Sequence, residues 1–229
     1  MDSDARPPEV HPQMMSLYVD SAVRDEVEPL LATGLFRGMT TNPTLLHRAG
    51  LTGADLPAVY DWAVAAGSRE VFVQAWGADA GAIEASGRKL RELGDATVIK
   101  VAATGAGLQA AAKLAADGIP VLVTVVYAVH QAVSAAAAGA QFLAPYVGRM
   151  ADLGLAGRED TLQMHRILQS SGTGARVLAA SVRSTADLVA LAAGGVDAFA
   201  LPVPVCRALL HDAHTETAAA AFDALSAEW

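Results

Sequence analysis

The sequence has little cysteine, little basic charge and no long apolar run, and each shortage excludes a class of protein. Cys206 is the only cysteine among 229 residues, so no disulfide can form within the chain and a reducing, cytoplasmic location is expected. No run of roughly eighteen apolar residues occurs, which argues against a membrane-spanning helix. The formal net charge of −8 argues against nucleic acid or an anionic membrane as a partner.

Several motifs of metal and cofactor chemistry are also missing. The six histidines fall in the tail, in helices or in loops and form no cluster at strand ends, so we expect no zinc site. Neither Gly-x-x-x-x-Gly-Lys-Ser/Thr nor Gly-x-Ser-x-Gly is present. No Gly-x-Gly-x-x-Gly turn follows the first apolar run. The sequence therefore predicts neither a metal nor a cofactor.

What is present indicates a compact globular protein. Hydrophobic residues make up 53% of the chain and charged residues 17%. Residues 1–14 are acidic and contain proline without an apolar signal region, so we expect a flexible tail there. We expect residues 15–229 to form a single domain, because no break in composition divides them.

Short β-branched runs alternate with amphipathic segments along this domain. The pattern predicts strands over 17–19, 36–41, 71–74, 97–102, 121–127, 142–147, 177–181 and 198–203. It predicts helices over 22–32, 56–66, 80–93, 106–116, 129–138, 160–170 and 186–193. Eight such units predict an α/β fold, a (β/α)8 TIM barrel, with an additional C-terminal helix over 214–229. A doubly wound open sheet is the alternative, which the missing glycine-rich turn disfavours.

Lys100 is one of only three lysines and lies within the β-branched run Val98-Ile99-Lys100-Val101. Burying an ammonium without a partner is costly, and desolvation lowers the pKa of a lysine. The resulting neutral amine is a nucleophile that can form a Schiff base with a carbonyl. The alternative is a lysine at a strand end that reaches solvent or an ion-pair partner.

Polar residues follow the apolar runs at seven of the eight predicted strands. In such barrels the carboxyl ends of the strands form the site, so we expect these side chains to converge. They are Asp20, Thr41, Asn42, Gln74, Lys100, Thr124, Tyr146 and Ser181.

Some of these residues have a purely structural alternative. Asp20 could cap a helix, Asn42 before Pro43 could form a turn, and Tyr146 could be a core aromatic. Arg149 and Arg183 could be surface charges. Alternatively they form an anion site with Ser181 on neighbouring loops.

Five motifs, in order and with similar spacing over residues 16–229, resemble the transaldolase family, and its short fructose-6-phosphate aldolase branch most closely. They are Leu-Tyr-Val-Asp-Ser at Asp20, Thr-Thr-Asn-Pro-Thr at Asn42, Val-Ile-Lys-Val at Lys100, Ala-Pro-Tyr-Val-Gly-Arg at Arg149 and Ala-Ala-Ser-Val-Arg at Arg183. The resemblance implies a class I aldolase in which Lys100 forms the Schiff base and Asp20 orients or polarises groups near its amine. It also implies that Asn42 holds substrate hydroxyls or the lysine and that Thr41 binds substrate.

The resemblance also implies the remaining roles. Gln74, Thr124 and Tyr146 are similar to the aldolase branch, in which they hold a water and the tyrosine is the acid/base, whereas transaldolases proper carry Glu and Phe at the first and last positions. Because glutamine cannot titrate, another group must move the proton, and a phenol aimed at a bound water can serve. Arg149, Ser181 and Arg183 match phosphate-binding positions.

The expected reaction is reversible cleavage of a ketose phosphate such as fructose 6-phosphate. Transaldolase activity and a non-catalytic sugar-phosphate-binding barrel are the alternatives. The family has Lys-Val-Pro and a second acid where this chain has Lys100-Val101-Ala102 and Ala151, two differences in the loops around the pocket. The resemblance further implies a homo-oligomer, a pentamer or decamer, with the segment 215–229 across a neighbour.

Overall fold

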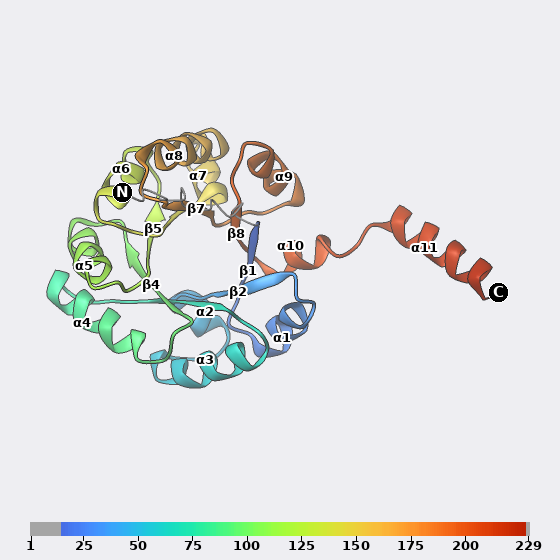
Figure 1. The fold of residues 1–229 in the computed structure, drawn as a ribbon, viewed down its shortest axis with the longest axis horizontal. Coiled ribbons are helices and arrows are strands. Elements are labelled where there is room, and N and C mark those ends of the chain that lie inside the picture. Colours follow the sequence, from blue (N-terminus) through green and yellow to red (C-terminus); the bar gives the residue numbers. More distant parts are fainter. Residues whose placement is uncertain (1–14, 228–229) are drawn as a thin grey trace, which may run out of the picture.

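The computed structural model describes residues 15–227, in which eight parallel strands close into a barrel surrounded by helices (Figure 1). The strand order follows the chain, and β1 pairs with β8 to close the ring. The predicted (β/α)8 barrel is therefore confirmed, and so is the additional C-terminal helix. The predicted tail 1–14 lies outside the described residues, as do residues 228 and 229.

The strands are β1 Ser16–Asp20, β2 Phe36–Thr40, β3 Glu70–Gln74, β4 Thr97–Ala102, β5 Val121–Val126, β6 Phe142–Pro145, β7 Arg176–Ala179 and β8 Ala198–Leu201. The helices are α1 Arg24–Ala32, α2 Pro43–Arg48, α3 Leu56–Ala65, α4 Ala80–Arg91, α5 Gly105–Ala116, α6 His130–Ala137, α7 Val147–Asp152, α8 Gly157–Ser171, α9 Thr185–Ala193, α10 Val203–Ala208 and α11 Ala213–Ser226. A 3-10 turn, Gly53–Asp55, precedes α3.

The predicted strands 142–147, 177–181 and 198–203 are too long at their carboxyl ends. β6 and β8 stop two residues early, and the next apolar residues, Val147 and Val203, begin α7 and α10. Both valines are buried, and a short buried helix cannot be told from a strand by an apolar run alone. β7 stops before Ser181, whose φ of 56° lies outside the extended region.

Alternation along each strand divides the apolar residues between two cores. On β4, Ile99 and Val101 face outward into the layer between the sheet and the helices, whereas Val98 belongs to the cluster inside the barrel. Lys100 has the same parity as Val98 and therefore faces the barrel interior. The same rule places Gln74 inward with Phe72 on β3.

Aromatic rings fill the middle of the barrel. The ring of Phe72 packs edge-on against Tyr18 at 5.0 Å and against Phe142 at 5.4 Å, centroid to centroid. Toward the amino ends of the strands, the Tyr18 hydroxyl donates to the Glu70 carboxylate at 2.5 Å, and Arg37 Nε donates to the same carboxylate at 2.6 Å. Burial raises the pKa of Tyr18 above its ordinary value. The amino end is thus closed by packed and paired groups.

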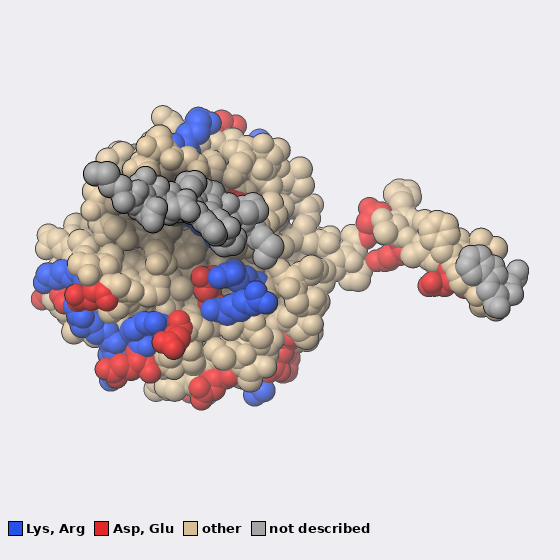
Figure 2. All heavy atoms as spheres, in the orientation of Figure 1, with Lys and Arg blue, Asp and Glu red and all other residues tan. Residues whose placement is uncertain are grey.

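The C-terminal helix α11 stands away from the barrel (Figure 1). All its side chains are exposed, including Phe222 at 68% and Leu225 at 60%. Figure 2 shows acidic but no basic side chains on this arm, which contains Glu216 and Asp223. Within the described part of the chain, no helix is long and apolar enough to cross a membrane.

Candidate active site

A cavity of about 250 Å³ opens at the carboxyl ends of the strands, above the aromatic layer. Its lining brings together eight of the ten residues predicted for the site, from six strands or the loops that follow them. These are Asp20, Asn42, Lys100, Thr124, Tyr146, Arg149, Ser181 and Arg183. Residues far apart in the sequence therefore meet around one small space.

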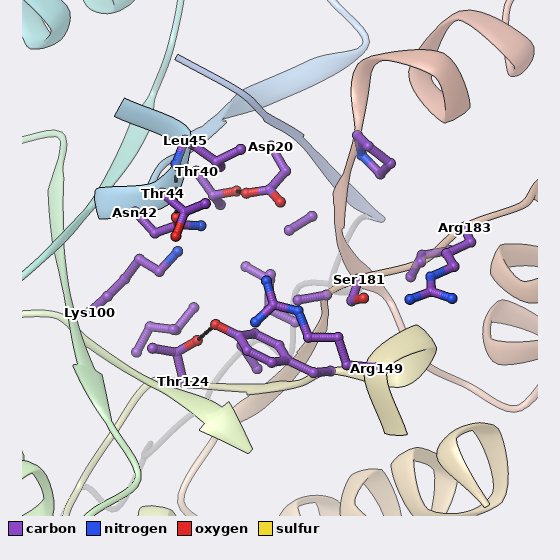
Figure 3. Close-up of a pocket in the computed structure, with 18 of the residues that line it drawn as sticks. Asp20, Thr40, Asn42, Thr44, Leu45, Lys100, Thr124, Arg149, Ser181 and Arg183 are labelled. Carbon is purple, nitrogen blue, oxygen red and sulfur yellow. Dashed lines mark hydrogen bonds between the residues drawn. The ribbon is translucent and has the colours of Figure 1, made fainter. Parts of the chain in front are cut away.

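Lys100 is buried, with 6% of its surface exposed, and its Nζ donates one hydrogen bond, to the Thr41 carbonyl oxygen at 2.7 Å. No described residue forms an ion pair with it. Burial lowers the pKa of Lys100, and the Asp20 carboxylate offsets part of that effect. Figure 3 shows the amine extending toward Asn42. The sequence-based alternative of a solvent-reaching lysine is wrong.

Asp20 and Asn42 are held on the β1–β2 side of the cavity by local hydrogen bonds. The Thr40 hydroxyl donates to Asp20 Oδ1 at 2.6 Å, so this carboxylate is fixed by a neighbouring strand and does not cap α1, which begins after Val23. Asn42 Oδ1 accepts from the Leu45 amide at 3.0 Å and caps α2. Asn42 therefore has a structural role as a helix cap, and its side chain also lines the cavity.

Tyr146 lies on the opposite side, directly after β6. The Thr124 hydroxyl donates to the Tyr146 oxygen at 3.2 Å, and the guanidinium carbon of Arg149 lies 4.5 Å from the Tyr146 ring centre. That stacking is a cation–π contact, which restrains both side chains. The phenol therefore presents its oxygen to the same cavity as the amine of Lys100.

The backbone beside Thr124 is strained. Val125 has a φ of 61°, which is rare for a β-branched residue, and the β5–β6 register shifts between Val123 and Val126. Bulges and residues in sparsely populated conformations recur at functional sites because they redirect side chains. The irregularity lies at the strand end where the Thr124 side chain turns into the cavity.

Helix α7 and the loop after β7 form the cationic side of the cavity, and a glycine in α7 allows them to approach. A Cβ on Gly148 would lie 2.5 Å from the Ser181 carbonyl oxygen, so only glycine fits there. Arg183 makes a two-pronged hydrogen-bonded pair with Asp152, its Nη1 reaching Oδ1 at 2.6 Å. This pairing lowers the pKa of Asp152. Arg183 therefore lines the cavity while its charge is already paired with that of Asp152.

Two predicted residues lie outside the lining, and three further polar residues lie within it. Thr41 is buried and contributes its carbonyl to Lys100, while its hydroxyl has no hydrogen-bond partner among the described residues. Gln74 pairs with Lys100 in register but does not line the cavity. The three missed residues are Thr40, Thr44 and Arg48. The spacing of four between the last two puts them on one face of α2, and recognition of this short helix would have indicated it.

The described residues contain no group of three or more His, Cys, Asp or Glu side chains that could hold a metal ion. The thiol of Cys206, the only cysteine in the chain, is also unsuited to act as a nucleophile. Cys206 is fully buried, donates to the Leu201 carbonyl at 3.4 Å, and burial raises its pKa to about 12. Cys206 is also absent from the cavity lining, whereas the amine of Lys100 lies within it.

The fold and this cavity define a (β/α)8-barrel protein with a buried lysine in a cavity at the carboxyl ends of its strands. The family model Transaldolase/Fructose-6-phosphate aldolase matches residues 17–229. The chain thus belongs to the transaldolase/fructose-6-phosphate aldolase family and is an enzyme of the aldolase/transaldolase type.

Curated relatives agree with this assignment. A probable transaldolase of Hyphomonas neptunium is 34% identical over 196 residues, covering 86% of this chain and 89% of the relative. A probable transaldolase of Jannaschia sp. is 33% identical over 215 residues, covering 94% and 96%. Among solved structures, a mandelate oxidase variant shares the fold, with a TM-score of 0.58 and 20% identity over 86% of this chain and 66% of that one. At that identity the likeness shows the fold alone.

Proposed function

We propose that this protein is a class I aldolase in which Lys100 forms a Schiff base with a ketose phosphate such as fructose 6-phosphate. The observation that carries the proposal is the burial of Lys100 at the cavity with one carbonyl as its hydrogen-bond partner. Because burial lowers the pKa of this amine, a larger fraction is neutral and nucleophilic near neutral pH.

The chemistry follows from that amine. Its lone pair attacks the C2 carbonyl, and loss of water leaves a protonated imine joined to Lys100. A base removes the proton of the C4 hydroxyl, the C3–C4 bond breaks, and its electrons pass to the iminium to give an enamine. Glyceraldehyde 3-phosphate leaves. Protonation of the enamine at C3 and hydrolysis of the imine then release dihydroxyacetone and restore the lysine.

We assign the proton transfers to Tyr146, whose oxygen faces the cavity and is hydrogen-bonded to Thr124. Gln74 cannot titrate and would assist only by holding a water. The Asp20 carboxylate favours the cationic iminium, as it favours the lysine ammonium. Asn42 is positioned to bind substrate hydroxyls, with Thr41 acting through its carbonyl on Lys100.

The substrate phosphate would bind at Arg149, Ser181 and Arg183, which line the cavity together. Of the two arginines, only Arg149 lacks an ion-pair partner among the described residues, so we expect it to provide the main attraction. Arg183 retains further N–H donors beyond those directed at Asp152, because guanidinium carries five.

Transaldolase activity is the second candidate, and the names of the curated relatives favour it. In that reaction the enamine attacks a second aldose before it is protonated. The Tyr146–Thr124 pair favours the aldolase, because a phenol at the cavity can protonate the enamine. A coupled assay for glyceraldehyde 3-phosphate, run with and without erythrose 4-phosphate, separates the two. Turnover that requires the acceptor would refute the aldolase assignment.

Borohydride trapping tests the Schiff base itself. The protein is incubated with dihydroxyacetone, reduced and digested, and peptide mass spectrometry locates the adduct. We expect it on Lys100 and expect none on a Lys100→Met variant. Failure to label Lys100 in the wild-type protein would refute both enzymatic candidates and would favour the non-catalytic sugar-phosphate-binding barrel.

We also propose that the protein works as a homo-oligomer in the cytoplasm. The support for assembly is α11, an exposed helix whose Phe222 and Leu225 lie on one face without a partner in the described chain. A second copy could cover that face, in a pentamer or decamer as the family resemblance implies. Light scattering of the full chain and of a Phe222→Ser/Leu225→Ser variant provides the test. Equal masses for the two proteins would refute the assignment of α11 to the interface.

A further inference from the structure

Two arginines that line the active-site cavity have no charge partner among residues 15–227. Arg149 stacks on Tyr146, and Arg48 is exposed on α2. The third arginine of the lining, Arg183, is paired with Asp152. An anionic ligand would therefore meet two unpartnered guanidinium groups.

These two groups lie on opposite sides of the barrel. α2 follows β2 and α7 follows β6, and strands four apart in a ring of eight are diametrically opposed. Lys100 lies on β4, between them in strand order. The asparagine cap and Pro43 fix the start of α2, and its six residues span only about 9 Å, so Arg48 stays close to the rim of the cavity.

The amine of Lys100 lies toward the α2 side, because its hydrogen-bond partner is the carbonyl of Thr41, two residues before that helix. A ketose joined there through C2, with its phosphate at Arg149 as proposed above, would extend its long arm, C3 to C6, across the cavity. Its short end, C1, is then directed toward α2. That side presents Asn42, Thr44 and Arg48 to the cavity.

We propose that Arg48 binds an anionic group on C1 of the substrate, so that the cavity takes ketoses with a phosphate at each end. The inference rests on the proposed aldolase function, since it assumes that C2 is joined to Lys100. Guanidinium binds phosphate through two parallel charge-assisted hydrogen bonds, which gives both affinity and orientation. Arg48 would thus determine the choice between mono- and bisphosphorylated substrates.

The test compares cleavage of fructose 6-phosphate with cleavage of fructose 1,6-bisphosphate. Both release glyceraldehyde 3-phosphate, so one coupled assay measures both. We expect the wild-type protein to cleave the bisphosphate, and Arg48→Gln to lower the ratio of kcat/KM for bisphosphate over monophosphate by roughly tenfold to hundredfold. Arg48→Lys, which keeps the charge without the planar fork, should retain part of that ratio.

Arg69→Gln is the matched control. It removes another exposed arginine, which lies before β3 at the amino end of the barrel and outside the cavity lining, and it should leave the ratio unchanged. Trapping with dihydroxyacetone and with dihydroxyacetone phosphate gives a second readout, because Arg48→Gln should weaken labelling of Lys100 by the phosphate more than by dihydroxyacetone.

Two results would overturn the proposal: a wild-type protein that cleaves only the monophosphate, or an Arg48→Gln variant with an unchanged ratio. Failure of the aldolase function is recognised separately, by the absence of a dihydroxyacetone adduct on Lys100 and of any fructose 6-phosphate cleavage. Since Arg48 is exposed, its substitution leaves the packed core intact, and a thermal melt of each variant verifies this.

Discussion

Replacing Lys100 with methionine measures the cost of burying an amine in this barrel. The side chain is 6% exposed, and the pKa of its amine is lowered by burial more than the Asp20 carboxylate raises it. Methionine has a similar length and no charge, so the substitution removes the titrating group while it keeps most of the packing.

The sign and size of the effect of pH on the free energy of unfolding follow from the linkage between proton binding and unfolding. A lysine in the unfolded chain has a pKa of about 10.4, and that of folded Lys100 is lower. Between the two values the unfolded chain binds more protons, so the free energy of unfolding rises with pH in that window. For one proton the slope approaches about 1.4 kcal/mol per pH unit. Outside the window, Lys100 contributes no slope.

The assay is urea unfolding of both proteins from pH 6 to pH 10, at one protein concentration because assembly affects apparent stability. The quantity compared is the free energy of unfolding of the wild type minus that of Lys100→Met, in which contributions from other groups cancel. We expect this difference to increase with pH. Lys89→Met, which removes one exposed lysine from α4, corrects for the loss of a charge at the surface. A difference that is flat or falls with pH would refute the argument that the fold desolvates Lys100.

The same reasoning extends to the chemistry. Schiff-base formation needs the neutral amine, so the rate of borohydride trapping should rise through the folded pKa of Lys100 and level off above it. Asp20→Asn removes the group that raises this pKa, and the rise should therefore begin at lower pH. A rise displaced to higher pH in Asp20→Asn would contradict the assignment of Asp20 as a stabiliser of the cation.

Three further substitutions test other parts of the structure. Tyr146→Phe should lower kcat by roughly 10²- to 10⁴-fold, because it removes the proposed acid/base, yet Lys100 should still be trapped, and loss of trapping would argue for a different role. Gly107→Ala would place a Cβ 2.0 Å from the Ala102 carbonyl oxygen and should destabilise the fold by about 1–3 kcal/mol, seen as a lower Tm; an unchanged Tm would mean that α5 can shift without cost. Phe72→Ala empties the centre of the barrel and should cost about 3–5 kcal/mol in urea unfolding, and a cost below about 1 kcal/mol would contradict the packing described.

The barrel and the placement of Lys100 could be predicted because both follow from local pattern. Alternation on β4 fixes which residues face inward, and a parallel closed sheet brings strand ends to one rim. Thus Asp20, Thr124 and Tyr146, which are far apart in sequence, could be expected to meet. Asp20 ends β1, Tyr146 directly follows β6, and Thr124 lies two residues before the end of β5.

The rest depends on contacts between loops, which sequence pattern does not encode. Nothing local indicates that Arg183 would pair with Asp152, 31 residues away, and so enter the site with its charge partnered. The position of Arg48 in the cavity lining was missed because α2 is only six residues long, too short for helical periodicity to stand out. Gln74 was predicted at the cavity because it ends a predicted strand. It faces inward with Phe72, but it is not part of the lining.

The two ends of the barrel differ in how far their charged groups are paired within the protein. At the amino end, Glu70 accepts hydrogen bonds from Tyr18 and Arg37, and Arg176 pairs with Asp197 at 3.2 Å. At the carboxyl end, within residues 15–227, Lys100 has only a backbone carbonyl as its hydrogen-bond partner. The Asp20 carboxylate offsets only part of the cost of burying this amine, so its pKa stays below the ordinary value. Under the proposed function, a carbonyl substrate would convert that amine to an imine, and its anionic groups would pair with the unpartnered arginines. A ligand would therefore complete the pairing of charges at the carboxyl end, whereas the groups named at the amino end are paired within the fold.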